Sequence, residues 1–187
     1  MNFIGSALPD FSVQAFQNGE VTTLTPVDLK GHWSVLFFYP ADFSFVCPTE
    51  LGDLAEHYAA FQAQNAEIYS ISEDTEFVHQ AWHERSPEVG QVAYPMIADP
   101  AGQVARHYEV LDESAGQAYR GVFILDPQGE VRSYTINDMG IGRNAGEILR
   151  TLTAAQFVAE HGDRVCPANW HPGEETLKPG TNLVGKL

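Results

Sequence analysis

The sequence has few basic residues, few cysteines and no long hydrophobic run. Ten Lys and Arg residues stand against 25 Asp and Glu residues in 187, which gives a formal net charge of -15 and a pI near 4.6. Nucleic acids and anionic membrane surfaces are bound by clustered basic side chains, so we expect neither partner. The longest apolar run, residues 33–39, is far shorter than the roughly 20 residues that span a bilayer.

The two cysteines, Cys47 and Cys166, are far apart in the chain. This spacing excludes the Cys-x-x-Cys pair of a general thiol–disulfide oxidoreductase and every two-plus-two zinc-finger pattern. The first residues also lack the basic and apolar regions of a secretory signal, so we expect a cytoplasmic protein. In that reducing compartment an isolated thiol is either buried and inert or reactive.

The remaining composition is that of an ordinary globular protein, with 44% hydrophobic residues and no internal repeat. We predict one α/β domain over residues 1–160. Proline and glycine interrupt every regular pattern after residue 161, so residues 161–187 are predicted to form an irregular tail that wraps a surface or a partner subunit.

Hydrophobic periodicity predicts a strand–helix alternation along the domain. Asn18-Gly19 between two short alternating runs predicts a β-hairpin over residues 11–24. The predicted strands are residues 33–39, 66–72, 94–98, 121–125 and 130–136. The predicted helices are residues 48–64, 75–84, 100–109 and 145–160, the second of them capped by Asp74 or Thr75.

Cys47 lies between a predicted buried strand and a predicted helix, and Pro48 suits the first helical turn. Its sulfur should therefore lie near a helix N-terminus, where the backbone dipole favours a thiolate. Thiolate population alone does not make an efficient enzyme, so other groups must stabilise the transition state.

The segment from Pro40 to Cys47, PADFSFVC, resembles the active-site motif of the peroxiredoxins. The wider run FFYPADFSFVCPTEL, Arg120 before the strand at 121–125, and Val165-Cys166-Pro167 resemble the typical two-cysteine peroxiredoxins, most closely the bacterial alkyl hydroperoxide reductase (AhpC) subfamily. The resemblance covers essentially the whole chain. It implies a thioredoxin-like fold with an N-terminal β-hairpin extension and a thiol-dependent peroxidase that serves antioxidant defence.

The resemblance also implies a role for each residue of the motif. Cys47 would attack a hydroperoxide and become a sulfenic acid. Ser44, three residues earlier, would share a helical face with Cys47 and donate a hydrogen bond to the sulfur or to the peroxide. Arg120 would stabilise the thiolate and the leaving oxygen. Pro40 would shield the sulfur from water, and Glu50 would hold an arginine in position.

Cys166 matches the resolving cysteine of the family, which forms an intersubunit disulfide with the partner's Cys47. The same resemblance implies a homodimer, a ring of five dimers, and reduction by a separate NAD(P)H-dependent flavoprotein or by a thioredoxin system. Chemistry of this type needs no cofactor and no metal. Residues 112–116 and the chain after Cys166 depart from the elements of relatives that are sensitive to overoxidation, so we expect a robust enzyme.

The sequence leaves three other interpretations to consider. A thioredoxin-like binding protein or holdase chaperone with structural cysteines would retain its function in Cys47→Ser. The run from Gly140 to Ala145 matches G-x-G-x-x-A, but no further parallel strand follows it, as dinucleotide binding would require. His79 and His83 have helical spacing without a third ligand, which is more typical of a solvated helix face than of a metal site.

Overall fold

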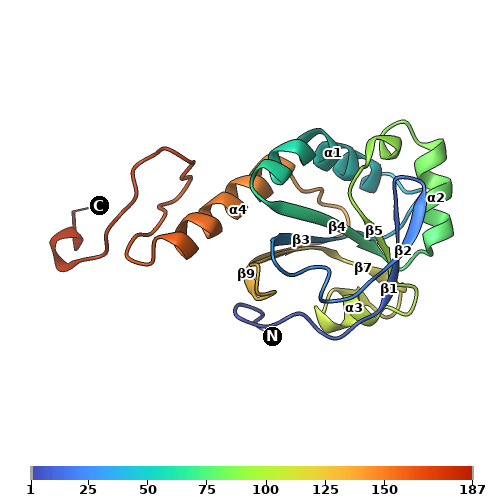
Figure 1. Ribbon diagram of the computed structural model, residues 1–187, viewed down its shortest axis with the longest axis horizontal. Helices are drawn as coiled ribbons and strands as arrows, with labels where there is room; N and C mark the ends of the chain where they lie inside the picture. Colours follow the sequence, from blue (N-terminus) through green and yellow to red (C-terminus); the bar gives the residue numbers. More distant parts are fainter. Residues whose placement is uncertain (1, 187) are drawn as a thin grey trace. The chain divides into compact units, whose positions relative to one another are not determined.

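The computed structural model describes residues 2–186, which form two compact units, residues 2–145 and 146–186 (Figure 1). Met1 and Leu187, the outer ends of the predicted domain and tail, lie outside the described residues. The predicted division at residue 160 stays a prediction.

The first unit is built on a seven-stranded mixed sheet. Its strand order is β2-β1-β5-β4-β3-β8-β9, with β3, β4 and β5 parallel to one another and the outer pairs antiparallel. The strands are β1 (Val13–Gln17), β2 (Glu20–Leu24), β3 (Trp33–Phe38), β4 (Ala66–Ser72), β5 (Met96–Ala98), β8 (Arg120–Leu125) and β9 (Val131–Asn137).

The predicted N-terminal hairpin is confirmed as β1 and β2. Asn18 and Gly19 at its turn have φ values of 52° and 85°, which asparagine and glycine tolerate better than other residues. The central strands β3 and β8 are buried along their whole length, because helices and loops cover both faces of the sheet there.

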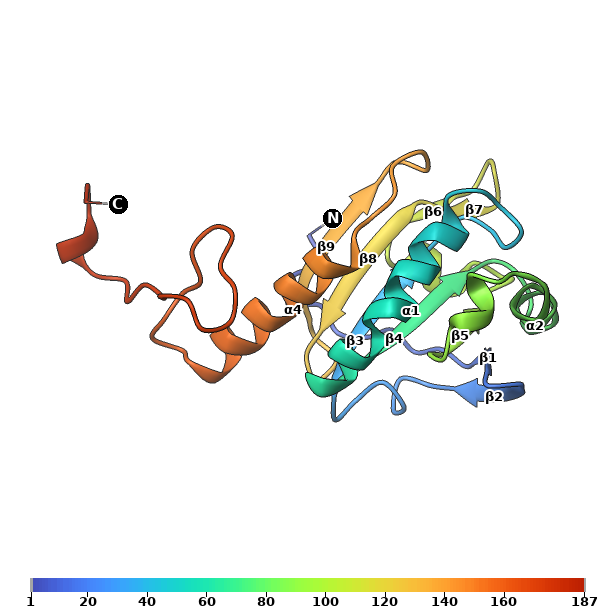
Figure 2. The same cartoon turned by 90° about the horizontal axis from the view of Figure 1, so that it is seen from above.

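The helices of this unit cover both faces of the sheet. They are α1 (Cys47–Ala63), α2 (Glu76–Arg85) and α3 (Gln103–His107). Figure 1 places α1 and α3 on opposite sides of the sheet, and Figure 2 shows α1 running over β3 and β4. Since α1 begins where the loop after β3 ends, the amino end of this helix lies at the carboxyl end of the central strand.

The predicted helix at 100–109 is shorter in the structure. Gly102 has φ 62° and Glu109 has φ 53°, so α3 is confined between two residues in the left-handed region. The Asp99 carboxylate accepts the N–H groups of residues 103–105 and so satisfies the first turn.

Three smaller differences concern short segments. The strand predicted at 94–98 begins only at Met96. The two-residue strands β6 (Leu111–Asp112) and β7 (Gln117–Ala118) form a separate hairpin that the sequence pattern is too short to predict. Thr75 occupies the N-cap of α2, but no side-chain capping hydrogen bond forms there.

The second unit contains most of α4 (Ala145–Glu160), a predicted helix that is confirmed, and the tail after it. Within the tail, Val165 and Leu177 form an isolated antiparallel bridge, and residues 181–183 make one 3₁₀ turn, η2 (Thr181–Leu183). Trp170 is 3% exposed and packs on Phe157 of α4, with ring centroids 5.1 Å apart. The tail is therefore irregular but folded against its own helix.

Candidate active site

Cys47 is fully buried and is the first residue of α1, one residue before the predicted start of this helix, so its place at a helix N-terminus agrees with the prediction. Val46 occupies the N-cap without a side-chain capping bond, and Pro48 stands in the first turn. The first-turn N–H groups give the sulfur the positive end of the helix dipole.

Arg120 lies directly against this sulfur. Its Nη1 is 3.4 Å from Sγ of Cys47 and donates a 2.6 Å hydrogen bond to Oε2 of Glu50, while its Nε donates to the carbonyl of Met139 at 2.7 Å. The residue is 3% exposed and begins β8, a central strand of the sheet. The guanidinium is therefore fixed from three directions beside Cys47.

Arg143 is a second buried guanidinium that the sequence pattern did not reveal. Its Nε and Nη2 donate to the two oxygens of Glu50 at 2.8 and 3.0 Å, and its Nη1 donates to the Gly121 carbonyl at 2.8 Å. The guanidinium also stacks 3.4 Å from the centre of the Phe37 ring. Burial lowers the pKa of Arg143, and the ion pair with Glu50 opposes this shift.

Arg143 lies within the G-x-G-x-x-A run, which positions its guanidinium beside Glu50. Gly142 precedes it, and a Cβ there would lie 3.3 Å from Cγ1 of Val46, the residue before Cys47. The segment therefore packs closely on the start of α1. The G-x-G-x-x-A pattern, which resembles a dinucleotide-binding motif, was therefore the sequence signal that could have pointed to Arg143.

Glu50 joins the two guanidinium groups and is 3% exposed. Two buried positive charges and one buried negative charge leave an excess of one positive charge beside Sγ. This excess of positive charge can stabilise negative charge that develops on an atom placed beside Sγ.

Ser44 does not lie as expected. Phe43 has φ 53° and turns the chain, and the helix begins only at Cys47, so the expectation that Ser44 and Cys47 share a helical face is wrong. The Ser44 hydroxyl donates to the Ala41 carbonyl at 2.7 Å and closes the loop. Pro40 is buried two residues after the end of β3.

A polar network that the sequence pattern did not reveal anchors the loop at 40–46. Asp42 accepts the Tyr39 hydroxyl at 2.7 Å, lies 2.8 Å from Nδ1 of His79, and donates its backbone N–H to Asp74. Burial raises the pKa of Asp42, and the contact with His79 opposes this shift.

The expected solvated face at His79 and His83 is wrong. His79 is fully buried, and its Nε2 lies 3.1 Å from the Ile97 carbonyl. His83 is partly buried against the carbonyl of Val92. Within residues 2–186, no group of three or more His, Cys, Asp or Glu side chains is placed to hold a metal ion.

Cys166 lies in the second unit. It is partly buried, and its Sγ is 3.9 Å from the Ala154 carbonyl of α4. Burial raises the pKa of the Cys166 thiol, and the positive charge of Arg150 opposes this shift. Both cysteines are free thiols in this structure.

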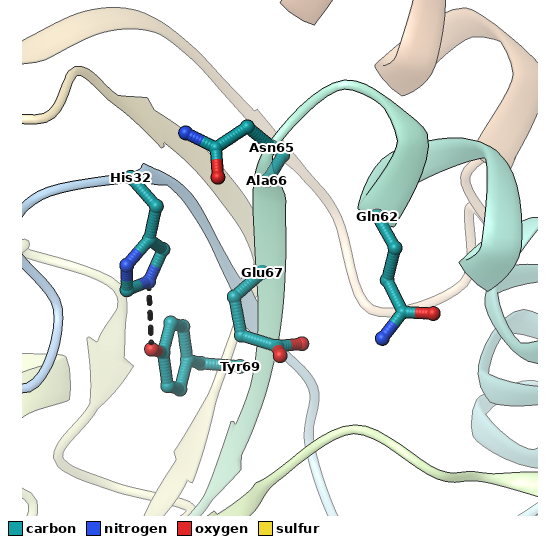
Figure 3. Close-up of a pocket in the computed structure, with 6 residues that line it drawn as sticks. All are labelled: His32, Gln62, Asn65, Ala66, Glu67 and Tyr69. Atoms are coloured by element: carbon teal, nitrogen blue, oxygen red, sulfur yellow. Dashed lines mark hydrogen bonds between the residues drawn. The ribbon is translucent and has the colours of Figure 1, made fainter.

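A polar cavity of about 280 Å³ lies at the amino ends of β3 and β4, away from the Cys47 end of those strands (Figure 3). His32, Tyr69 and Glu67 line it, and Nε2 of His32 is 3.1 Å from the Tyr69 hydroxyl. Burial raises the pKa of Glu67. Neither Cys47 nor Cys166 is among the described residues that line this cavity.

Comparison with known proteins gives a consistent result. Residues 4–134 match the AhpC/TSA family, and residues 154–186 match the C-terminal domain of 1-Cys peroxiredoxin. The chain is 50% identical over its whole length to alkyl hydroperoxide reductase C of Bacillus subtilis, and both chains are fully covered.

Solved structures extend the likeness to the fold. The crystal structure of Enterococcus faecalis AhpC superposes with a TM-score of 0.88 at 58% identity, covering 89% of this chain and all of that one. Reduced 2-Cys peroxiredoxin of Plasmodium vivax gives a TM-score of 0.92 at 29% identity, covering 97% of this chain and 96% of that one. The predicted thioredoxin-like fold is confirmed.

Along residues 2–186 we find no helix with the length and apolar character needed to cross a membrane.

The structure places a buried cysteine against an arginine at a helix N-terminus, and the chain is similar over its full length to the relatives above. The chain therefore belongs to the AhpC/TSA family and is a typical 2-Cys peroxiredoxin that reduces hydroperoxides.

Proposed function

We propose that Cys47 is the residue that reacts with the hydroperoxide. Its thiolate attacks the terminal peroxide oxygen, an S–O bond forms, and the O–O bond breaks. The departing alkoxide or hydroxide takes up a proton and leaves as alcohol or water, so that Cys47 becomes a sulfenic acid. The observation that carries this proposal is the 3.4 Å contact between Nη1 of Arg120 and the buried Sγ.

In this reaction Arg120 stabilises the thiolate and the negative charge that develops on the leaving oxygen. Glu50 holds Arg120 in place and is itself held by Arg143. Pro40 shields the sulfur from water. Ser44 donates to the peroxide once its hydroxyl rotates away from the Ala41 carbonyl.

In the second step, Cys166 of one subunit attacks the Cys47 sulfenic acid of the other. An S–S bond forms, the S–OH bond breaks, and water leaves after proton transfer, which gives an intersubunit disulfide. The irregular tail suits this role, because local opening costs less there than in a sheet.

The cycle then requires two electrons from outside the chain. A flavoprotein disulfide reductase or a thioredoxin system would supply them and return both sulfurs to thiols. The homodimer, its assembly into a ring of five dimers, and a cytoplasmic location belong to the same proposal.

A peroxide titration of the reduced protein, followed on a non-reducing denaturing gel, tests the proposal. Wild type should form a covalent dimer near one equivalent of peroxide per subunit, whereas Cys47→Ser and Cys166→Ser should not. Peroxide consumption without this dimer would remove Cys166 from its role, and the absence of consumption would refute the whole cycle.

Resistance to overoxidation follows if the disulfide forms quickly. The 21 residues after Cys166 contain no Tyr and no Phe, so they lack the Tyr-Phe motif that slows local unfolding in relatives that are sensitive to overoxidation. We expect mass spectrometry to show mainly disulfide, and little Cys47 sulfinate, after a few equivalents of peroxide.

A further inference from the structure

A buried polar network holds the loop that precedes the reactive thiol, residues 40–46. Asp42 lies at its centre, where Oδ1 accepts the Tyr39 hydroxyl at 2.7 Å and Oδ2 lies 2.8 Å from Nδ1 of His79. Asp42 is 8% exposed, whereas Tyr39 and His79 are fully buried. The backbone N–H of Asp42 donates to Oδ2 of Asp74 at 2.8 Å. The loop is therefore fixed at one residue by α2 and by the segments that follow β3 and β4.

The network continues from the loop to β5. Nε2 of His79 lies 3.1 Å from the Ile97 carbonyl, which can only accept, so Nε2 carries a hydrogen. The contact between Nδ1 and Asp42 then needs a second hydrogen, on the ring or on the carboxyl. Loss of the Asp42 side chain would leave the Tyr39 hydroxyl and Nδ1 of His79 without this partner in the interior, which is unfavourable.

The next residue of the loop also rests on α2. Phe43, which has φ 53°, packs on Trp82 with ring centroids 5.9 Å apart. Trp82 lies about one helical turn after His79 and is buried. One face of α2 therefore supports two consecutive residues of the loop, a polar one and an aromatic one.

The position of this loop affects the two steps of the proposed cycle differently. Cys47 has no exposed surface here, and its Sγ contacts Arg120. A disulfide forms only when the Cβ atoms of the two cysteines come within about 4.5 Å. The partner's Cys166 cannot reach Cys47 while this sulfur stays buried, so the segment around Cys47 must open between the two steps.

We propose that Asp42 is a positioning residue that holds the loop closed, through Tyr39 and His79, while peroxide reacts, and whose release limits disulfide formation. The proposal rests on the proposed functions of Cys47 and Cys166. Weakening the network raises the share of molecules with an open loop. Disulfide formation then becomes faster, whereas sulfenate formation, which uses the closed loop, does not. The ratio of the sulfenate rate to the disulfide rate therefore falls.

Two variants at Asp42 test this expectation. Asp42→Ala removes the network, whereas Asp42→Asn is the conservative variant, because its amide can accept from Tyr39 and donate to Nδ1 of His79. Rapid mixing with one equivalent of hydrogen peroxide measures both rates. In Asp42→Ala the ratio of the sulfenate rate to the disulfide rate should fall about threefold to tenfold, and Asp42→Asn should restore most of it.

Tyr39→Phe tests the same role with a smaller change, since it removes only the hydroxyl, and should lower the ratio by about twofold. Ser34→Ala is the matched control. Ser34 is fully buried, and its hydroxyl donates to the Leu29 carbonyl at 3.0 Å near the amino end of β3, away from Cys47. Its substitution should leave the ratio unchanged. A ratio that does not fall in Asp42→Ala and Tyr39→Phe, or that falls equally in Ser34→Ala, would overturn the proposal.

Hydrogen exchange of the reduced protein tests the loop without peroxide chemistry. The peptide that covers residues 40–50 includes the N–H groups of Asp42, Thr49 and Glu50, which are hydrogen bonded in the closed loop and the first turn of α1. Exchange there should be faster in Asp42→Ala than in wild type, with β8 unchanged. Unchanged exchange in this peptide, or an equal increase in β8, would contradict the positioning role. If wild type forms no sulfenate or no disulfide, the proposed function fails, whereas the exchange result still decides whether Asp42 holds the loop.

Discussion

At the residue scale, Glu50 organises the buried charge cluster beside Cys47. It accepts hydrogen bonds from two buried arginines that come from β8 and from the segment before α4. Removing one partner of a buried ion cluster leaves an uncompensated charge in a low-dielectric interior, which costs more than an exposed ion pair contributes. In the proposed mechanism, the same three side chains serve both the reaction at Cys47 and the stability of the fold.

The Arg120→Ala variant tests whether Arg120 takes part in peroxide reduction. Arg120→Ala removes the group that contacts Sγ, so peroxide reduction should slow by roughly 10² to 10³, the usual cost of one donor to a transition state. Stopped-flow measurement of sulfenate formation checks this value. An unchanged rate would remove Arg120 from the mechanism.

The Glu50→Gln variant tests whether the buried charge cluster stabilises the fold. Glu50→Gln leaves two buried guanidinium groups without a carboxylate, and we expect the free energy of unfolding to fall by about 3–5 kcal/mol. Urea unfolding of the reduced protein measures the change. Glu20→Gln on the exposed strand β2 is the control and should alter stability by less than about 0.5 kcal/mol. A similar small change in both variants would show that the cluster contributes little.

The sequence identified part of this site and missed the rest for a physical reason. Cys47, Ser44 and Glu50 stand within one short motif, which a local pattern can capture. Arg143 is 93 positions from Glu50, and their contact depends on how the chain crosses the sheet. Ser44 was placed on a helix because its spacing fits one, whereas the turn at Phe43 decides where the helix begins.

At the element scale, β8 is packed too closely for any side chain at Gly121. A Cβ there would lie 2.8 Å from Cγ1 of Val110 and 3.1 Å from Cε2 of Phe123. The Gly121 carbonyl also accepts the Nη1 bond of Arg143. The position of Arg143 therefore depends on the close packing of β8 at Gly121.

Gly121→Ala should therefore destabilise the protein by about 1–3 kcal/mol through overpacking. Thermal unfolding by circular dichroism measures this loss. Gly140→Ala is the control, because a Cβ at Gly140 would meet no atom within 4 Å. Equal melting temperatures for the two variants would mean that β8 has room to move.

The long elements were predictable, and the short ones were not. The strand at 33–38 is a continuous run that is buried at every residue, and the helix at 145–160 buries a periodic apolar face, so the sequence pattern determines both. The helix α3 is limited by the left-handed residues Gly102 and Glu109, and β6–β7 is only two residues long on each side. In those segments tertiary contacts outweigh the local pattern.

At the scale of the whole molecule, the partly buried carboxyl of Glu73 links stability to pH. Glu73 follows β4, and its Oε2 accepts the N–H of Ala118 on β7 at 2.9 Å, while its Oε1 is buried without a hydrogen-bond partner. Burial, with smaller contributions from Asp99 and Asp74, raises the pKa of Glu73 from 4.5 to about 7. The folded protein therefore holds this proton more tightly than the unfolded chain does.

The contribution of Glu73 to stability is present in full below pH 4.5 and is lost as the pH rises through about 7. Glu73→Gln, which stays neutral, should be more stable than wild type at pH 8, by on the order of 1–2 kcal/mol after allowance for solvent screening. The difference should disappear near pH 5. Urea unfolding at both pH values measures it, and a difference that does not depend on pH would contradict the assignment.

The central claim is that the enclosed Cys47 thiol, and no other group, receives oxygen from the hydroperoxide. Its most direct test is mass spectrometry of Cys166→Ser after one equivalent of peroxide in the presence of dimedone, which traps sulfenic acids. We predict one adduct, on the peptide that contains Cys47, and none after Cys47→Ser is added. Peroxide consumption without an adduct on Cys47 would contradict the account.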